Sequence, residues 1–151
     1  MDSVTLTIDG TPVSVAKGTT VLQAAIAHGF SVPYYCYHPG LGIDGSCRVC
    51  IVKIEKMPKL QTSCSTFCAE GMVVTTRDPE TTQARAGVLE FLLVNHPLDC
   101  PTCDKAGECI LQRLYFDWDA KASRVAVDKV KKPKRVDIGP EIVLDAERCI
   151  L

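Results

Sequence analysis

Residues 36–50 read Cys36-Tyr37-His38-Pro39-Gly40-Leu41-Gly42-Ile43-Asp44-Gly45-Ser46-Cys47-Arg48-Val49-Cys50. Three thiols share this one loop, and three glycines lie between the first thiol and the second. A fourth thiol, Cys64, follows after a short strand-like segment. Thiolates bind soft metals, and four of them complete one iron–sulfur cluster or one zinc site. Because glycine adopts positive φ without strain, backbone N–H groups can approach a bound group closely. We therefore interpret the loop as a cage for an inorganic cluster.

The length and net charge of the chain limit the classes of protein to which it can belong. It has 151 residues and a formal net charge of −1, which is room for one ordinary domain or two small ones. A charge near zero gives no indication of nucleic acid or an anionic membrane as partner. No apolar run approaches the roughly 18 residues of a membrane span, and the start at Met1-Asp2-Ser3 lacks a signal pattern. We expect a cytoplasmic or matrix-like chain that meets a membrane only through a partner.

Cysteine usage points to metal ligation. The chain has nine cysteines. Disulfides are rare in a reducing compartment, and an odd count also argues against a closed disulfide framework. Ligation of a metal or cluster is the interpretation that we favour.

The segment around the loop predicts a sheet with one helix. Apolar and polar residues alternate before and after Asp9-Gly10, a hairpin-turn signal. Thr20 and Gln23 fit a capping box for a short helix that Gly29 can close. The predicted strands are residues 4–8, 13–15, 49–54 and 72–76. A hairpin, one helix and further strands is the order of a β-grasp sheet, so we predict an α+β fold with a β-grasp [2Fe–2S] ferredoxin-like domain over 1–78, closed by Asp78-Pro79.

A second set of ligands follows a predicted helix. Residues 83–94 carry Val88, Leu89, Leu92 and Leu93 on one broad face, and the helix ends before Pro97. The second set comprises His96, Cys100, Cys103 and Cys109. With a further helix over 109–117, we predict a small helical domain over 79–120. Residues 121–140 are a basic connector, either solvated or a docking surface for another subunit, and 141–151 would begin another domain.

Each set leaves alternatives open. The first alternative for the first set is a zinc site on Cys36, Cys47, Cys50 and Cys64. A redox dithiol fits less well, because the Cys-x2-Cys motif does not open a helix in a βαβ context. Three cysteines and one histidine are also a common zinc composition, but beside a [2Fe–2S] site a second redox cluster is favoured. Cys68 is predicted to be a packed thiol, with exchange of ligand roles with Cys64 as the alternative. No nucleophile–base pair, Walker loop or dinucleotide glycine motif is present.

The motifs "YYCYHPGLGIDGSCRVC", "NHPLDCPTCDKAGEC" and "LDAERCIL" closely resemble the N-terminal iron–sulfur region of the G subunit of bacterial NADH:quinone oxidoreductase, respiratory complex I. The resemblance covers essentially the whole chain. It implies a [2Fe–2S] cluster on Cys36, Cys47, Cys50 and Cys64 and a [4Fe–4S] cluster on His96, Cys100, Cys103 and Cys109. It also implies that Cys149 is the first ligand of a further [4Fe–4S] cluster in a ferredoxin-like region. Members of this family continue far beyond the length of this chain, which is therefore expected to be a fragment or a truncated product.

The resemblance implies a one-electron relay from a flavin-bearing NADH site toward quinone, with no complete active site in this chain. The implied partners are other complex I subunits, above all the flavin subunit, with the membrane arm reached only indirectly and no nucleic acid. The implied location is peripheral, on the cytoplasmic side of the bacterial inner membrane. The same array also resembles the relay parts of NAD-linked hydrogenases, iron-only hydrogenases and some formate dehydrogenases. A structural zinc protein is the third alternative.

Overall fold

The computed structural model describes residues 2–118 and 121–149 and divides the chain into two compact units, Met1–Ala86 and Gly87–Leu151. The division falls inside helix α2 (Pro79–Val94), which begins in unit 1 and ends in unit 2. The described residues contain both helices and strands, as predicted for an α+β chain. Ala120, Ile150 and Leu151, which belong to predicted segments, lie outside the described residues.

Unit 1 is built on a mixed sheet. Within the described residues the sheet has five strands in the order β2-β1-β5-β3-β4. Its strands are β1 (Ser3–Ile8), β2 (Thr11–Ala16), β3 (Ile51–Ile54), β4 (Gln61–Thr62) and β5 (Val73–Thr75). Strand β1 pairs antiparallel with β2 and parallel with β5, whereas β3 pairs antiparallel with both β4 and β5. The predicted turn is confirmed, since Asp9 and Gly10 both adopt positive φ, at 47° and 82°.

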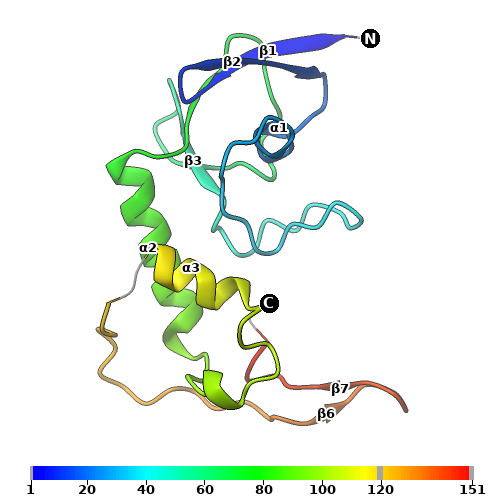
Figure 1. Ribbon diagram of the computed structural model, residues 1–151, viewed down its shortest axis with the longest axis vertical. Helices are drawn as coiled ribbons and strands as arrows, with labels where there is room; N and C mark the ends of the chain where they lie inside the picture. Colours follow the sequence, from blue (N-terminus) through cyan, green and yellow to red (C-terminus); the bar gives the residue numbers. More distant parts are fainter. Residues whose placement is uncertain (1, 119–120, 150–151) are drawn as a thin grey trace. The chain divides into compact units, whose positions relative to one another are not determined.

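Helix α1 (Val21–Ala27) lies next to the β1–β2 hairpin (Figure 1). The predicted capping box is present: the Gln23 N–H donates to Thr20 Oγ1 at 3.3 Å, and the Thr20 N–H donates to Gln23 Oε1 at 2.9 Å. The helix buries four small or aliphatic side chains. The core of unit 1 comprises Leu6, Ile8, Val13, Val21, Leu22, Ala24, Ala25, Val32, Cys50, Val52, Ile54, Cys64, Cys68 and Val74.

Helix α2 begins four residues before the predicted start at Gln83. Asp78 is its cap, because Asp78 Oδ1 accepts the N–H groups of Glu80 and Thr81, each at 3.1 Å. Pro79 then occupies the first helical position, where its missing N–H costs no hydrogen bond. Asp78-Pro79 therefore starts a helix and does not merely close the first unit. Of the predicted apolar face, Leu89 is buried at 1% exposure, and Val88, Leu92 and Leu93 are half-buried.

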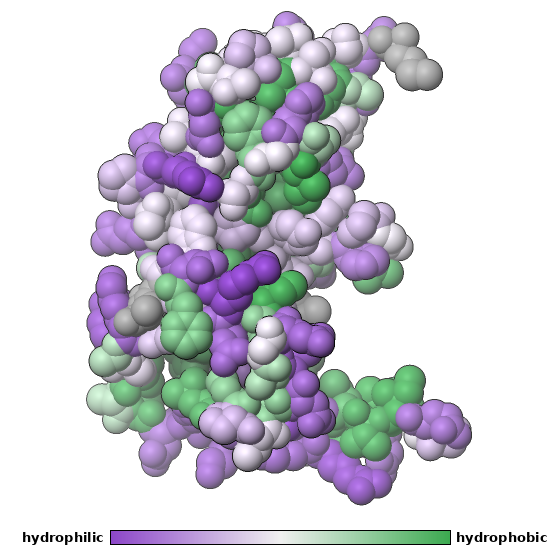
Figure 2. Space-filling model, viewed as in Figure 1, coloured by the Kyte–Doolittle hydropathy of each residue, from purple (hydrophilic) through white to green (hydrophobic). Residues whose placement is uncertain are grey.

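Unit 2 contains few regular elements after α2. They are a 3₁₀ turn, η1 (Cys100–Thr102), helix α3 (Ile110–Trp118) and a hairpin of β6 (Val136–Asp137) and β7 (Val143–Leu144). Residues 121–135 form no helix or strand. Figure 2 shows hydrophobic surface over the β6–β7 hairpin, whose exposed apolar side chains are Val136, Ile138, Ile142 and Val143. Among the described residues, no helix is both long and apolar enough to cross a membrane.

Candidate metal centres

The pairing of two short strands brings the ends of the first thiol set together. Ile51 of β3 stands opposite Thr62 of β4, so the preceding Cys50 stands beside Ser63 and next to Cys64. The Ser63 N–H and hydroxyl both donate to the Cys50 carbonyl, at 3.1 and 2.7 Å. Sequence patterns missed β4, because two residues carry no period. These hydrogen bonds hold the backbone at Cys50 against the backbone that precedes Cys64.

The four thiols of the first set act on one another. Burial raises the pKa of the Cys64 thiol to about 12, and Cys50, Cys36 and Cys47 add to the rise. Cys47, Cys50 and Cys64 are buried, whereas Cys36 is half-buried. Sulfurs so close together repel as thiolates, and a bound cation or iron–sulfur core would relieve that repulsion. The structure therefore places Cys50, Cys36 and Cys47 within electrostatic reach of Cys64.

Backbone N–H groups of the loop face the sulfurs, as the glycine content predicted. The Cys36 N–H donates to Cys47 Sγ at 3.4 Å. Burial acts to raise the pKa of Cys36, but hydrogen bonds from the Cys47 and Gly45 N–H groups and from Ser46 outweigh it and lower that pKa. Gly45 has φ of 74°, a conformation that favours glycine. Donors aimed at ligand sulfurs stabilise negative charge there, which fits an anionic cluster.

Cys68 has different surroundings from Cys64. Its side chain is 7% exposed and belongs to the apolar core, and its N–H donates to the Thr19 carbonyl at 2.9 Å. Burial raises the pKa of the Cys68 thiol. The prediction of a packed thiol is confirmed, while the choice of Cys64 as ligand stays a prediction.

The second set lies around the end of α2 and the turn that follows. His96 comes two residues after the helix, and its buried Nδ1 has no hydrogen-bond partner among the described residues. Burial lowers the pKa of His96, which favours the neutral imidazole that a metal requires. Cys109 Sγ accepts the Gln112 N–H at 3.4 Å. His96, Cys100 and Cys109 all line one cavity of about 730 Å³ in unit 2.

Lys129, which sequence patterns assigned to a solvated connector, caps α2. Its Nζ donates to the carbonyls of Leu93 and Val94 at 2.7 and 2.9 Å. The next residue, Val130, donates its N–H to Asn95 Oδ1 at 3.0 Å. Lys129 is half-buried, so this part of the connector is packed on the helix end that precedes His96. A lone lysine in a basic run gives no signal of such a contact.

The segment around Cys149 is tied to the turn that carries Cys100. Asp99 binds Arg148 Nη2 at 2.7 Å and Lys134 Nζ at 3.4 Å. Hydrogen bonding to Arg148 holds the pKa of Asp99 below its usual range. Cys149 itself is exposed, and its role as a ligand of a further cluster stays a prediction.

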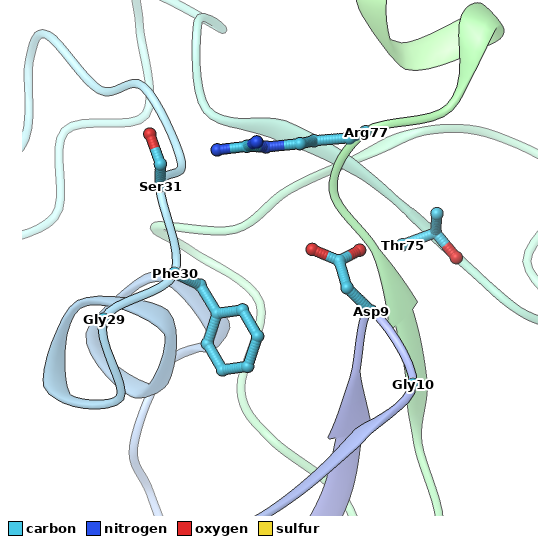
Figure 3. Close-up of a pocket in the computed structure, with 7 residues that line it drawn as sticks. All are labelled: Asp9, Gly10, Gly29, Phe30, Ser31, Thr75 and Arg77. Carbon is cyan, nitrogen blue, oxygen red and sulfur yellow. The ribbon is translucent and has the colours of Figure 1, made fainter.

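A second hollow, in unit 1 and of about 630 Å³, lies away from the predicted ligands. In Figure 3 the Arg77 side chain extends across this hollow toward Ser31, and the Asp9 carboxylate lies beside it. Asp9 accepts the Thr76 N–H at 2.7 Å and its hydroxyl at 2.6 Å, which ties the hairpin turn to the end of β5. Among the described residues, no three or more His, Cys, Asp or Glu side chains form a group that could hold a single metal ion. An iron–sulfur cluster spreads its ligands over several irons, so this finding concerns a single ion only.

Models of two iron–sulfur families match the two parts of the chain that hold the candidate sites. A model of the family described as "2Fe-2S iron-sulfur cluster binding domain" matches residues 1–79, and one described as "NADH-ubiquinone oxidoreductase-G iron-sulfur binding region" matches residues 85–124. The matches support one [2Fe–2S] and one [4Fe–4S] cluster.

Named relatives align with nearly the whole length of this chain. The G subunit of the NADH-quinone oxidoreductase of Streptomyces coelicolor is 47% identical over 99% of this chain and 18% of its own length. The "NADH-ubiquinone oxidoreductase 78 kDa subunit, mitochondrial" of Neurospora crassa is 45% identical over 97% of this chain and 20% of its own. The chain thus spans about a fifth of the length of these relatives.

A solved structure also matches. A chain of an "NAD+-reducing [NiFe]-hydrogenase in the H2-reduced state" superposes with a TM-score of 0.86 at 36% identity, covering 99% of this chain and 63% of that one. The resemblance to the complex I iron–sulfur subunit drawn from the motifs is confirmed by the relatives. From the match over its first 79 residues, the chain belongs to the family of 2Fe-2S iron–sulfur cluster binding domains.

Proposed function

We propose that Cys36, Cys47, Cys50 and Cys64 hold one [2Fe–2S] cluster in unit 1. The observation that carries the proposal is that Cys50, Cys36 and Cys47 all lie close enough to Cys64 to raise its pKa. The N–H groups that reach Cys36 and Cys47 support it, because they would stabilise the charge of an iron–sulfur core. The sheet order and the single crossing helix of unit 1 support a β-grasp fold for residues 1–78.

His96, Cys100, Cys103 and Cys109 are the proposed ligands of a [4Fe–4S] cluster in residues 79–120. The buried, unpartnered His96 Nδ1 supports this assignment, as does the cavity that His96 shares with Cys100 and Cys109. Residues 121–140 form the connector in this proposal. Residues 141–151 would begin a further [4Fe–4S] region with Cys149 as its first ligand.

The two clusters supply one-electron chemistry, and the chain would pass single electrons from a flavin site toward quinone within an NADH:quinone oxidoreductase. The polypeptide itself buries three of the first-set thiols and directs N–H donors at the sulfurs. It thereby excludes water and stabilises the ligands' negative charge. The proposed partners are other complex I subunits, chiefly the flavin subunit. The proposed location is the cytoplasmic side of the inner membrane, with the membrane arm reached only through those partners.

Metal analysis and spectroscopy test the cluster content. Anaerobic reconstitution of the 151-residue chain should give about six irons and six acid-labile sulfides per chain, two from the first cluster and four from the second. Dithionite reduction should produce two distinct EPR signals. A colourless protein that binds zinc in both sites would overturn the proposal.

The solved hydrogenase structure favours a second candidate, a relay between NAD and a hydrogen-activating centre. Deletion of the gene in its own host separates the two. Loss of NADH-dependent quinone reduction in membranes supports the complex I assignment. Loss of hydrogen-dependent NAD⁺ reduction with quinone reduction intact supports the hydrogenase instead.

A further inference from the structure

The largest fully buried side chain in the described part of the chain is a cation. Arg85 lies in the unit 1 part of α2 and is only 1% exposed. Burying a guanidinium is costly unless its donors are satisfied and an opposite charge lies near. The helix pattern predicts an apolar residue at such a position, so the arginine calls for a physical explanation.

Each of the three side-chain nitrogens of Arg85 donates a hydrogen bond to a backbone carbonyl. Its Nε and Nη2 both donate to the Ile51 carbonyl, at 3.1 and 2.6 Å, and its Nη1 donates to the Thr76 carbonyl at 3.0 Å. Ile51 directly follows Cys50, whose own carbonyl is held by Ser63. The guanidinium is therefore fixed in place against the backbone that carries a proposed ligand.

Among the groups that favour the charged form of Arg85, Cys50 acts most. Burial lowers the pKa of Arg85 to about 10, and Cys50 opposes that change more than Asp78 or Asp9 does. Because this pKa still lies well above neutrality, Arg85 keeps its charge at pH 7. A fixed positive charge thus lies within electrostatic reach of Cys50 in a buried region, where salt screens it poorly.

We propose that the Arg85 guanidinium is a fixed counter-charge of the [2Fe–2S] cluster and raises its reduction potential. The inference rests on the proposed ligation of that cluster through Cys50. Arg85 would keep its proton while reduction of a cluster bound there added one electron and one unit of negative charge. A nearby cation stabilises the reduced form more than the oxidised form, so the potential rises. Arg85 is a positioning residue here, because it acts through Cys50 and Ile51.

Three substitutions separate charge from packing. Arg85→Gln and Arg85→Met remove the charge, and Arg85→Lys keeps it with fewer donors. Arg77→Gln is the control, because Arg77 is an exposed arginine of the same unit whose charge also reaches Arg85 but lies in solvent, which weakens its effect on a buried site. Each 151-residue protein is reconstituted with iron and sulfide, and the midpoint potential of the [2Fe–2S] signal is measured by EPR during titration with dithionite.

Arg85→Gln and Arg85→Met should lower the equilibrium constant of reduction about tenfold, a shift of about 59 mV for one electron. Arg85→Lys and Arg77→Gln should stay within about threefold of the wild type. The two uncharged variants could fail to retain the cluster. In that case, retention of the cluster by Arg85→Lys at a potential near that of the wild type supports Arg85 as the counter-charge. The inference is overturned if the equilibrium constant of reduction of an uncharged variant stays within threefold of the wild-type value. It is also overturned if the potential of Arg85→Lys shifts as far as that of Arg85→Gln, or if Arg85→Lys loses the cluster. Absence of any [2Fe–2S] signal in the wild type would instead reject the proposed ligation.

Discussion

Cys64 and Cys68 lie four residues apart and are both buried, yet only Cys64 has a pKa raised by the other thiols of the first set. Cys64→Ser should therefore abolish the [2Fe–2S] EPR signal, whereas Cys68→Ser should leave it unchanged, because Cys68 packs in the core. Iron content of the reconstituted variants checks the result independently. Loss of the signal in Cys68→Ser with retention in Cys64→Ser would reverse the ligand assignment.

As a proposed ligand, His96 would bring a neutral imidazole to the second site, where a thiolate would add negative charge. His96→Cys should keep a four-iron cluster but lower its midpoint potential. His96→Ala should leave a labile iron and favour a three-iron form. Redox titration followed by EPR measures both effects. An unchanged potential in His96→Cys would mean that His96 is not a ligand.

Candidate ligands can be proposed from the sequence because thiols and imidazoles carry their chemistry wherever they lie, and their assignment stays a prediction. The contacts of Arg85 and Lys129 could not be predicted, because a charged side chain in a helix or a basic run normally faces water. Their partners are backbone carbonyls that only the folded chain brings near. Burial of a cation by carbonyls leaves no local pattern in the sequence.

At the scale of elements, local signals decided which helices could be predicted in full. The capping box at Thr20 and Gln23 is local and fixed the start of α1. The start of α2 was misplaced, because residues 79–82 contain no apolar residue to extend the helical period and Asp78-Pro79 also fits a turn. Strands β4 and β6 have two residues each, too few to show a periodic pattern, and are defined by their pairing with β3 and β7.

Asp78 should stabilise the start of α2 in a pH-dependent way. Burial acts to raise the pKa of Asp78, but the Thr81 hydroxyl and N–H groups outweigh it, so its pKa is lowered on folding. A carboxyl with a lowered pKa contributes stability above its unfolded value, near pH 4, and loses it as the pH falls through the folded value. Asp78→Ala should cost about 1 kcal/mol in the free energy of unfolding at pH 7. Urea denaturation at pH 7 and at pH 3 measures this, and a cost of equal size at both values would contradict the role.

Lys129 should stabilise the other end of α2. Lys129→Met removes two hydrogen bonds and a cation from the helix C-terminus, which should cost about 1 kcal/mol in the free energy of unfolding. Lys131→Met is the matched control, since Lys131 is an exposed lysine of the same segment. Denaturation followed by α-helical circular dichroism compares the two. The same loss in both variants would show a general effect of charge and not a cap.

At the scale of the whole molecule, the two units differ in how much core they possess. Most of the buried hydrophobic residues of unit 1 form one continuous apolar cluster. In the described part of unit 2 the buried hydrophobic residues are Leu89, Leu111 and Leu114. A core that small supplies little of the free energy needed to order a chain. Cluster binding would then provide much of the folding free energy of unit 2, as metal sites do when the unfolded chain lacks them.

Removal of iron should therefore affect the two units unequally. Hydrogen exchange of the apo-protein should remain slow in β1, β2 and α1, whose hydrogen bonds belong to the sheet and its helix. Exchange should become fast over residues 96–117, where the proposed ligands His96, Cys100, Cys103 and Cys109 lie. A variant without the first cluster, Cys47→Ser, is the control, because it should keep residues 96–117 protected when iron is present. Equal protection of residues 96–117 with and without iron would show that their structure does not depend on the cluster.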